Sequence, residues 1–482
     1  MKLIMSESCQ VKLDTVVQFV KVDTAPVFTC PKLQEAYDAA YAGDDTSLKA
    51  GAFKTLRLRA NDMFVNVILI AFDCSSKKAF DDFKKATFKL GTKLNELKAT
   101  NVVIDKLTDL VFASKEEILL QFASNLPLCD YAFDKYLIKK AGYTDKTVTI
   151  IGDESLQPAL DEGKTIADGV IIARDLVNEP AEVLTSPEYA DRVVTLGKEY
   201  GFETEIFSKD KIEEFGMGAF LAVARASIHE PKLIVMRYNG GGDEIAKGLI
   251  GKGVCYDTGG LGIKNTAGMA TMKGDMAGSA AVVGAMCAIA KNKLEKNVVA
   301  VIAACENVIA GNAYRNGDLV HTMAGKSVYV ASTDAEGRLT LADAITYMIR
   351  KEKVDSIVEL STLTGTNAMF YSGVCCSMLT TSDELFNSVN AVSKVACEKY
   401  DRVPHFDEFR EFIKHDIADL YNSSTKGAGC ITAGLFLDEF SEDMPYMHVD
   451  VAGNTFNSAK KDGEPAGGNG FGVKTLYHYI KG

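Results

Sequence analysis

Two short stretches of this sequence hold the side chains best suited to chemistry. Both are rich in glycine and small residues, and together they offer four carboxylates, two lysines and an arginine. Carboxylates that converge repel one another and are costly to bury without partners, and a divalent cation resolves both problems. Oxygen ligands suit Mg, Mn or Zn, and four carboxylates are enough for a site with two metal ions. The residues are Lys252, Asp257, Lys264 and Asp275 in the first stretch and Asp334, Glu336 and Arg338 in the second.

Short apolar segments lead into these residues. Such segments predict buried strands, and ligands of open α/β sheets bind outside the carboxyl ends of the strands. We therefore expect three strands to deliver polar turns to one edge of a sheet. The strands 249–256, 326–331 and 355–360 lead into Asp257, Asp334 and the segment 361–365.

Other common nucleophile patterns are missing from the sequence. None of the six histidines lies in either stretch, and the chain contains no His-Glu-x-x-His pattern, no Gly-x-Ser-x-Gly elbow and no P-loop. Metal-activated water is the remaining nucleophile, because a metal ion can lower the pKa of bound water to about 7. A di-metal site of this kind hydrolyses peptides or phosphate esters.

At these residues the chain resembles the leucyl aminopeptidase family, the di-metal peptidases also called cytosol aminopeptidases. That family carries a Gly-Lys-Gly…Asp-[Ser/Thr]-Gly-Gly…Lys…Met…Asp-Met block and an Asn-Thr-Asp-Ala-Glu-Gly-Arg block. The resemblance covers roughly residues 170–475, and the second block is highly specific. The matching residues are Gly251-Lys252-Gly253, Asp257-Thr258-Gly259-Gly260, Lys264, Met272, Asp275-Met276 and Thr333-Asp334-Ala335-Glu336-Gly337-Arg338.

The resemblance implies a set of metal ligands. Asp257, Asp334 and Glu336 would hold one ion. Lys252 and Asp275 would hold the other, together with Asp257 and Glu336, which would bridge the two ions. The Lys252 amine must then be neutral, and adjacent dications would displace its proton. The family pattern implies Zn, with Mn, Mg or Co as alternatives at one of the two sites.

The resemblance also implies catalytic and substrate-binding residues. Lys264 would polarise the scissile carbonyl and stabilise the oxyanion during attack by a metal-bridging water. Arg338 would hold a bicarbonate ion that acts as a proton shuttle. An apolar pocket would favour Leu or Met at the N-terminus of a peptide. Its lining residues would be Met272, Thr362, Leu363, Gly365 and Ala452.

The chain departs from the family pattern at a few positions. Ser332 stands where Asn is usual, and residues 454–456 read Asn-Thr-Phe where Thr-Ala-Trp is common. Neither change removes a predicted metal ligand, so both bear on residue preference rather than on the reaction. Two other functions stay open: a phosphatase, and a non-enzymatic scaffold or nucleic-acid-binding regulator. Lys252 as a ligand and the second block weigh against the first, and the intact ligand set weighs against the second.

The length of 482 residues suggests two or three domains, and the alternation of predicted strands and helices predicts an α/β fold, for which we expect two domains. Residues 1–153 would form a smaller α/β domain and 154–178 a linker helix. Residues 179–482 would form the catalytic α/β/α domain, with a mostly parallel mixed sheet. Within the first domain we expect strands in 55–72, 102–107 and 147–152 and helices over 77–97 and most of 115–137. In the second we expect strands at 203–207, 232–238, 297–305 and 447–451 and helices at 186–200, 275–291, 339–351, 382–399 and 432–440.

The composition of the chain indicates its cellular location and the kinds of partner it binds. The net charge of −12 argues against a nucleic-acid surface. Residues 1–13 lack the apolar core of a secretory signal, and no apolar run approaches the ~18 residues of a membrane span. Eleven cysteines without a Cys-x-x-Cys pair indicate reduced thiols and a cytoplasmic protein. The resemblance adds peptide substrates and a homohexamer, a dimer of trimers.

Overall fold

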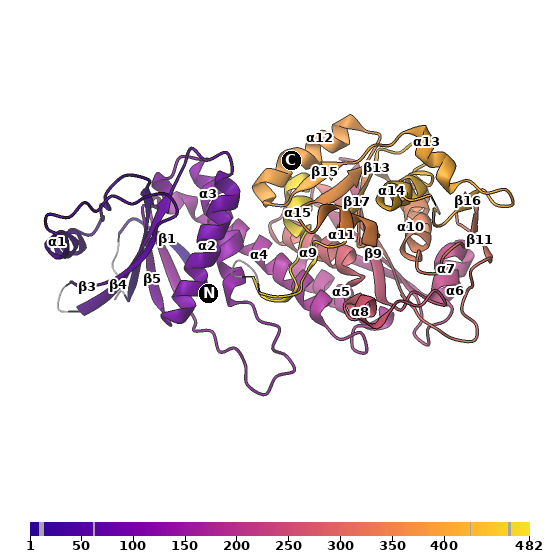
Figure 1. Ribbon diagram of the computed structural model, residues 1–482, viewed down its shortest axis with the longest axis horizontal. Coiled ribbons are helices and arrows are strands. Elements are labelled where there is room, and N and C mark those ends of the chain that lie inside the picture. The colour runs from indigo at the N-terminus through magenta and orange to yellow at the C-terminus, as the bar shows by residue number, and fades with distance from the viewer. Residues whose placement is uncertain (9–13, 61–62, 425, 461–463) are drawn as a thin grey trace. The chain divides into compact units, whose positions relative to one another are not determined.

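The computed structural model describes residues 1–8, 14–60, 63–424, 426–460 and 464–482. The chain forms two compact units (Figure 1), the first being Met1–Ala167 with Lys460–Pro465 and the second Asp168–Ala459 with Ala466–Gly482. The division falls inside helix α4 (Gln157–Asn178), between the boundaries predicted at residues 153 and 179. Each unit is built on a largely parallel sheet, which confirms the predicted α/β class.

The first unit is a six-stranded sheet with helices on both faces. All neighbouring strands are parallel except β3, which runs antiparallel to β4. Alternate residues of β2 enter two cores: Val17 and Phe19 pack with α2 and α3, whereas Val16 and Val20 pack with α1. In sheet order the strands are β1 (Lys2–Ser6), β6 (Thr147–Ile151), β5 (Asn101–Asp105), β2 (Thr15–Lys21), β4 (Met63–Phe72) and β3 (Phe53–Ala60), and the helices are α1 (Pro31–Ala40), α2 (Ala79–Glu96) and α3 (Lys115–Asn125).

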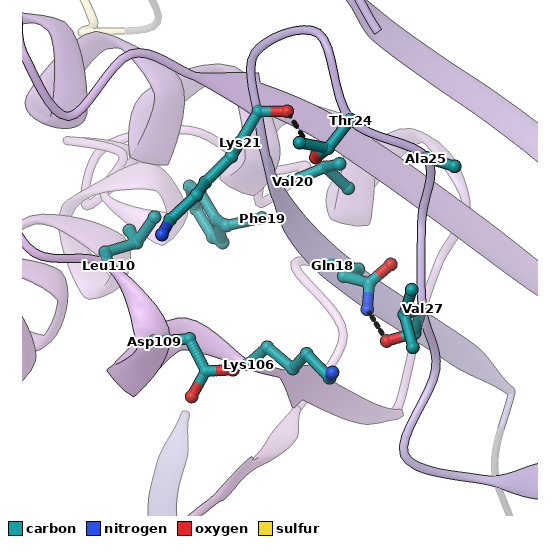
Figure 2. A pocket seen from close by; sticks show the side chains of 10 residues that line it. All are labelled: Gln18, Phe19, Val20, Lys21, Thr24, Ala25, Val27, Lys106, Asp109 and Leu110. Atoms are coloured by element: carbon teal, nitrogen blue, oxygen red, sulfur yellow. Dashed lines mark hydrogen bonds between the residues drawn. The ribbon is translucent and has the colours of Figure 1, made fainter. Parts of the chain in front are cut away.

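A hollow lies at the carboxyl ends of two central strands of this unit (Figure 2). β5 ends at Asp105, opposite Gln18, whereas β2 continues to Lys21. The Gln18 amide donates to the carbonyl oxygen of Val27 at 2.6 Å and holds the segment that follows β2. The lining includes none of the predicted site residues, so this hollow is separate from the predicted chemistry.

The second unit is a three-layer α/β/α structure on an eight-stranded mixed sheet. Its four central strands, β17, β13, β9 and β10, are parallel, as predicted for this mostly parallel mixed sheet. On one side β14 is antiparallel to β17 and parallel to β15, and on the other β8 is antiparallel to both β10 and β7. In sheet order the strands are β15 (Tyr400–Arg402), β14 (Cys376–Leu379), β17 (Tyr446–Asp450), β13 (Val354–Ser361), β9 (Ala246–Asp257), β10 (Asn297–Asn307), β8 (Lys232–Asn239) and β7 (Glu203–Phe207).

Helices cover both faces of this sheet, which explains why its central strands are apolar throughout. Ile250 and Val254 of β9 pack in the core shared with α7, α10 and α14. Gly251 faces the other way, where a Cβ would lie 2.3 Å from the Cα of Ser279 in α9. The helices are α5 (Ser186–Tyr200), α6 (Lys209–Glu214), α7 (Gly218–Ala224), α8 (Thr266–Met269), α9 (Ala277–Lys291), α10 (Gly337–Lys351), α11 (Gly365–Tyr371), α12 (Asp383–Ala396), α13 (Asp407–Arg410), α14 (Gly429–Asp438) and α15 (Val473–Lys481).

Two predictions about elements were wrong. The helix predicted over most of 115–137 stops at Asn125, because Pro127 cannot continue it and the chain tightens into a 3₁₀ turn, Leu126–Asp130. The strand predicted at 326–331 is only β12 (Ser327–Tyr329), and it lies outside the main sheet. It forms a local hairpin with β11 (Leu319–His321), joined by a turn at Gly325, and also pairs with β16 (Leu420–Tyr421). Asp334 therefore reaches the site from a small separate sheet.

Within the described ranges, no helix combines the length and the apolar character that a membrane crossing requires. The ten cysteines of this part of the chain are all free thiols. Two short strands, β18 (Phe456–Asn457) and β19 (Gly467–Gly468), form a further antiparallel pair.

Candidate metal centre

The five residues predicted to hold metal lie in one cluster at the end of β9. Lys252 lies within the strand and Asp257 is its last residue. The Lys252 amine lies 2.8 Å from a carboxylate oxygen of Asp275 and 2.8 Å from one of Glu336. Asp257, Asp334 and Glu336 each offer an oxygen within 4.8 Å of the others. The main sheet, the start of α9 and the start of α10 thus deliver the cluster together.

The cluster is buried on one side and open on the other. The side chains of Lys252, Asp257, Asp275 and Glu336 are at most 4% exposed. Asp334 is 40% exposed, and Lys264 beside it is 18% exposed. A substrate therefore has access from the side of Asp334 and Lys264.

Two lysines neutralise part of the negative charge. Lys264 Nζ lies 2.7 Å from Asp257 Oδ2 and 2.5 Å from Asp334 Oδ1. Burial opposes the charge on both Lys252 and Lys264, but the surrounding carboxylates outweigh it and raise the pKa of each amine. When all four carboxyl groups are ionised, they exceed the two ammonium groups of the cluster by two negative charges.

Burial and neighbouring charges shift the pKa values of the four carboxyl groups. Burial raises the pKa of Asp257, and the neighbouring Glu336 carboxylate raises it further. Burial also raises the pKa values of Asp275 and Asp334, against the opposing effect of the nearest lysine. For Glu336, burial is outweighed by Lys252 and Lys264, and the pKa falls. The cluster is short of positive charge, which is the electrostatic condition that a divalent ion would relieve.

The residues present fit divalent metal ions. Among the described residues, Glu336 Oε2 is a buried oxygen without a hydrogen-bond donor, and it belongs to the most enclosed part of the cluster. A buried carboxylate oxygen without a partner is costly unless a cation completes it. Oxygen-rich ligands with one amine suit Zn, Mn, Mg or Co, and the number of carboxylates allows two ions to share ligands.

A second layer of polar groups orients Asp257, and sequence reasoning missed it. Asn307 Nδ2 donates to Asp257 Oδ1 at 2.7 Å and to the carbonyl of Thr333 at 3.0 Å. The backbone N–H of Gly259 donates to the same Asp257 oxygen at 2.8 Å. Tyr314 OH donates to the Thr333 carbonyl at 2.7 Å. Asn307 ends β10 directly opposite Asp257 in the register of the parallel pair. The sequence did predict the apolar strand that leads to Asn307, but it placed the end of that strand two residues earlier, at Cys305.

Two glycines make room for the cluster. A Cβ on Gly337 would lie 2.4 Å from Lys252 Cε and 2.7 Å from its Nζ. Gly259 has a φ of +85°, and a Cβ there would lie 2.8 Å from Asp334 Oδ1. Glycine at these positions is therefore required by the close approach of the charged side chains and, at Gly259, by the backbone as well.

Three of the five predicted pocket residues donate hydrogen bonds to a buried aspartate, either Asp275 or Asp450. Thr362 Oγ1 donates to Asp275 Oδ1 at 2.8 Å, next to the cluster. The backbone N–H groups of Leu363 and Ala452 both donate to Asp450 Oδ1 at 3.1 Å. The other two lie beside these groups in the chain: Gly365 begins α11, and Met272 begins the 3₁₀ turn that ends at Asp275.

Arg338 is the second residue of α10 and is 6% exposed. Burial lowers its pKa to about 10, against the opposing charges of Glu336 and Asp450. Its Nε finds no acceptor in the described part of the chain. The guanidinium is thus a buried cation near Glu336 and Asp450, and the described residues form no ion pair with it.

The chain matches known proteins over most of its length. Residues 171–477 match the model of the cytosol aminopeptidase family, catalytic domain. Probable cytosol aminopeptidases of Clostridium perfringens and Clostridium tetani are each 40% identical to it, over 86% of this chain and 86% and 87% of theirs. The structure of the bottromycin maturation enzyme BotP in complex with Mn superposes with a TM-score of 0.86 at 28% identity, covering 98% of this chain and 99% of that one.

The α/β/α fold, the buried carboxylate cluster and these matches define a metal-dependent peptidase. The chain belongs to the cytosol aminopeptidase family. The resemblance seen in the two sequence blocks is thereby confirmed.

Proposed function

We propose that this protein is a leucyl-type aminopeptidase that removes apolar N-terminal residues, Leu or Met, from peptides with the help of two divalent ions. The observation that carries the proposal is the convergence of Lys252, Asp275 and Glu336 with Asp257 and Asp334 in one cluster that opens on a single side. The ions would be Zn, with Mn, Mg or Co as alternatives at one site. BotP, the similar solved structure, is a complex with Mn.

The chain's own residues would divide the work around the ions. Bound divalent ions would supply an activated water and polarise the substrate carbonyl. Asp257, Asp334 and Glu336 would hold one ion, and Lys252 and Asp275 would complete the second set with Asp257 and Glu336. Lys252 would bind as a neutral amine, so its proton must leave when the ions enter.

Lys264 is suited to stabilise negative charge on the substrate. Its ammonium group lies at the open side and contacts Asp257 and Asp334. Once cations balance those carboxylates, the Lys264 ammonium can turn to a substrate oxygen that gains charge. We further propose that Arg338 holds a bicarbonate ion, which would carry a proton between the nucleophile and the leaving amine. The buried, unpaired Nε of the guanidinium supports this role within the described chain.

Met272, Thr362, Leu363, Gly365 and Ala452 would line the pocket for the N-terminal side chain. Four of them are half-buried and Gly365 is exposed, as expected for groups that a substrate can reach. Apolar contacts from such a lining favour Leu and Met. The free α-amine of the substrate would bind at an ion, which limits cleavage to the N-terminus.

Hydrolysis of leucyl anilide tests the proposal. We expect metal-dependent release that a chelator abolishes and that Asp334→Ala lowers by about 10²-fold or more, as loss of a metal ligand should. Asp243→Ala, an exposed acidic position outside the cluster, is the control and should retain activity. A folded protein that binds two metal ions yet releases nothing would refute the peptidase function, and phosphate esters would then be assayed.

We also propose that the chain acts in the cytoplasm on peptide substrates and assembles as a homohexamer, a dimer of trimers. The names of the curated relatives support the cytosolic location. Light scattering tests the assembly, and a monomeric mass at micromolar concentration would contradict it.

A further inference from the structure

A buried acidic side chain joins the two loops that carry predicted pocket residues. Asp450 is the last residue of β17 and is fully buried. Its Oδ1 accepts the backbone N–H of Leu363 and that of Ala452, each at 3.1 Å, and more weakly that of Thr364 at 3.4 Å. Its Oδ2 accepts Thr364 Oγ1 at 2.6 Å. One carboxylate thus collects donors from both loops.

Asn367 adds to this connection as a hydrogen-bond donor, whereas Asp450 acts as an acceptor. It lies in α11, fully buried, and its Nδ2 donates to the backbone carbonyls of Asp450 at 3.0 Å and Ala452 at 2.9 Å. Its Oδ1 accepts the backbone N–H of Ser377 in β14 at 3.2 Å. Its own backbone N–H donates to Thr364 Oγ1 at 3.0 Å. Both polar atoms of the Asn367 side chain therefore have partners: Nδ2 holds the chain at Asp450 and Ala452, and Oδ1 fixes the side chain to β14.

The sheet alone cannot set the distance between the two loops. β13 and β17 are parallel neighbours whose register ends with Ser361 opposite Asp450, and the last ladder bond runs from Val451 N to Ser361 O at 2.8 Å. Beyond this point the two chains separate, one into residues 362–365 and α11, the other into residues 452–455. The side chains of Asp450 and Asn367 replace the missing ladder bonds.

We propose that Asp450 and Asn367 are positioning residues that hold the two walls of the substrate pocket, Leu363 on one side and Ala452 on the other, at a fixed spacing. This spacing determines which N-terminal side chain the enzyme accepts. The inference rests on the proposed function, since it assigns the pocket walls to substrate binding. Neither residue is a predicted metal ligand, but the charge of Asp450 acts on Arg338, so the Leu/Ala selectivity rather than the overall rate is the deciding measurement.

Asp450→Asn tests the role with little change in size. The amide keeps one acceptor oxygen, but its NH₂ group cannot accept from Thr364 Oγ1, and the negative charge is lost. We expect kcat/KM for leucyl anilide to fall by about 10- to 100-fold, because small misplacements of a binding group have effects of this size. Alanyl anilide fills less of the pocket, so its kcat/KM should fall less and the Leu/Ala selectivity should narrow at least about threefold. The bound metal content should stay unchanged.

Asp343→Asn is the matched control. Asp343 in α10 is also fully buried and also accepts backbone N–H groups, from Phe220 at 2.9 Å and Met323 at 2.7 Å, away from the cluster and the pocket. Burial raises the pKa of both aspartates. The control should shift the unfolding temperature without shifting the Leu/Ala selectivity. If Asp450→Asn does not fold, Thr364→Val removes two hydrogen bonds of the network, the one to Asp450 Oδ2 and the one from the Asn367 backbone N–H, and Thr364→Ser restores them.

Hydrogen exchange separates this inference from the proposed function. In Asp450→Asn, amides in segments 361–368 and 450–454 should exchange faster than in the unaltered protein, whether or not any peptide is cleaved. In Asp343→Asn these segments should be unchanged. Faster exchange with narrowed selectivity supports the proposal. An unchanged Leu/Ala ratio, or unchanged exchange in both segments, would overturn it. A protein that cleaves no substrate but shows the exchange result would refute the aminopeptidase function alone.

Discussion

At the scale of single residues, the metal ligands depend on neighbours that make no contact with substrate. The Asn307 amide and the backbone N–H of Gly259 both donate to Oδ1 of Asp257, so the carboxylate that would bridge two ions is fixed in orientation. Groups that hydrogen-bond a metal ligand without touching the ion typically change metal affinity by about 10- to 100-fold when they are removed.

Asn307→Ala should therefore weaken metal binding by about 10- to 100-fold while the fold persists. Asn297→Ala is the matched control, since Asn297 is a buried asparagine at the other end of β10 that donates to the carbonyls of Gly242 and Glu244. Titration calorimetry with Mn or Zn compares the two variants. Equal affinities in both would show that Asn307 does not support the centre.

Sequence reasoning found the residues of this site that share local motifs and missed those that only the sheet register brings together. Lys252, Asp257 and Glu336 belong to short blocks whose residue types and spacing have chemical meaning on their own. Asn307 and Asp450 are single polar residues at strand ends and belong to neither of the two blocks, although Ala452, which was predicted to line the pocket, lies two residues after Asp450. Their significance follows from the pairing of β10 with β9 and of β17 with β13.

At the scale of elements, the start of α10 is shaped by the side chain of Lys252. Gly337 is the first residue of the helix, and a Cβ there would lie within 3 Å of three atoms of the lysine. Replacing glycine by alanine usually stabilises a helix by about 1 kcal/mol, but here the added methyl must displace the lysine from the cluster.

Gly337→Ala should accordingly lower peptidase activity by at least about tenfold and weaken metal binding. Gly311→Ala serves as the control, because no atom lies within 4 Å of the added Cβ. Anilide hydrolysis and metal content, measured on both variants, check the prediction. Full activity in Gly337→Ala would mean that Lys252 does not need its observed position.

Helix α15 carries a buried histidine that should make stability depend on pH. Burial, with Lys474 and Lys481, lowers the pKa of His478 to about 3. The unfolded chain binds this proton near pH ~6.5, so the stabilisation is present above that pH and is lost as pH falls toward about 3. The loss approaches about 1.4 kcal/mol per pH unit within this window.

His478→Gln should flatten the decline in unfolding free energy between pH 6.5 and pH 4, whereas His321→Gln, at an exposed position, should not. Urea denaturation at several pH values, followed by circular dichroism, measures the slopes. Parallel slopes for the unaltered protein and His478→Gln would contradict the assignment.

The predicted elements were most accurate where apolar periodicity was strong. Helices α2, α4, α5 and α9 and strands β6, β7 and β8 lie within a few residues of their predicted bounds. The two wrong predictions, at 126–137 and 326–331, extended an apolar pattern too far. A proline ends the helix in the first segment, and a hairpin shortens the strand in the second. The mixed, mostly parallel sheet followed from strands that are apolar on both faces.

At the scale of the whole molecule, the acidic cluster should link metal content to stability. The chain carries a net charge of −12, and the cluster holds four carboxyl groups against two lysines. Ions that bind the native state but not the unfolded chain stabilise it by about 2.7 kcal/mol at a concentration of 100 times the Kd.

Addition of Mn or Zn to chelator-treated protein should therefore raise the unfolding temperature by a few degrees. Asp334→Ala should reduce this shift, and Asp243→Ala should preserve it. Differential scanning calorimetry gives the comparison. An unfolding temperature that does not respond to either ion would exclude a metal site at this cluster.

Two buried free thiols lie on the strands that end at the site, β9 and β10. Cys255 on β9 and Cys305 on β10 are each 1% exposed, and burial raises the pKa of both. A thiol that is neither accessible nor ionised cannot be alkylated until the strands around it part. The rate at which these two cysteines react with an alkylating reagent therefore measures how often the strands of the central sheet separate. Because the same strands carry the candidate site, this rate also measures how long the site stays intact.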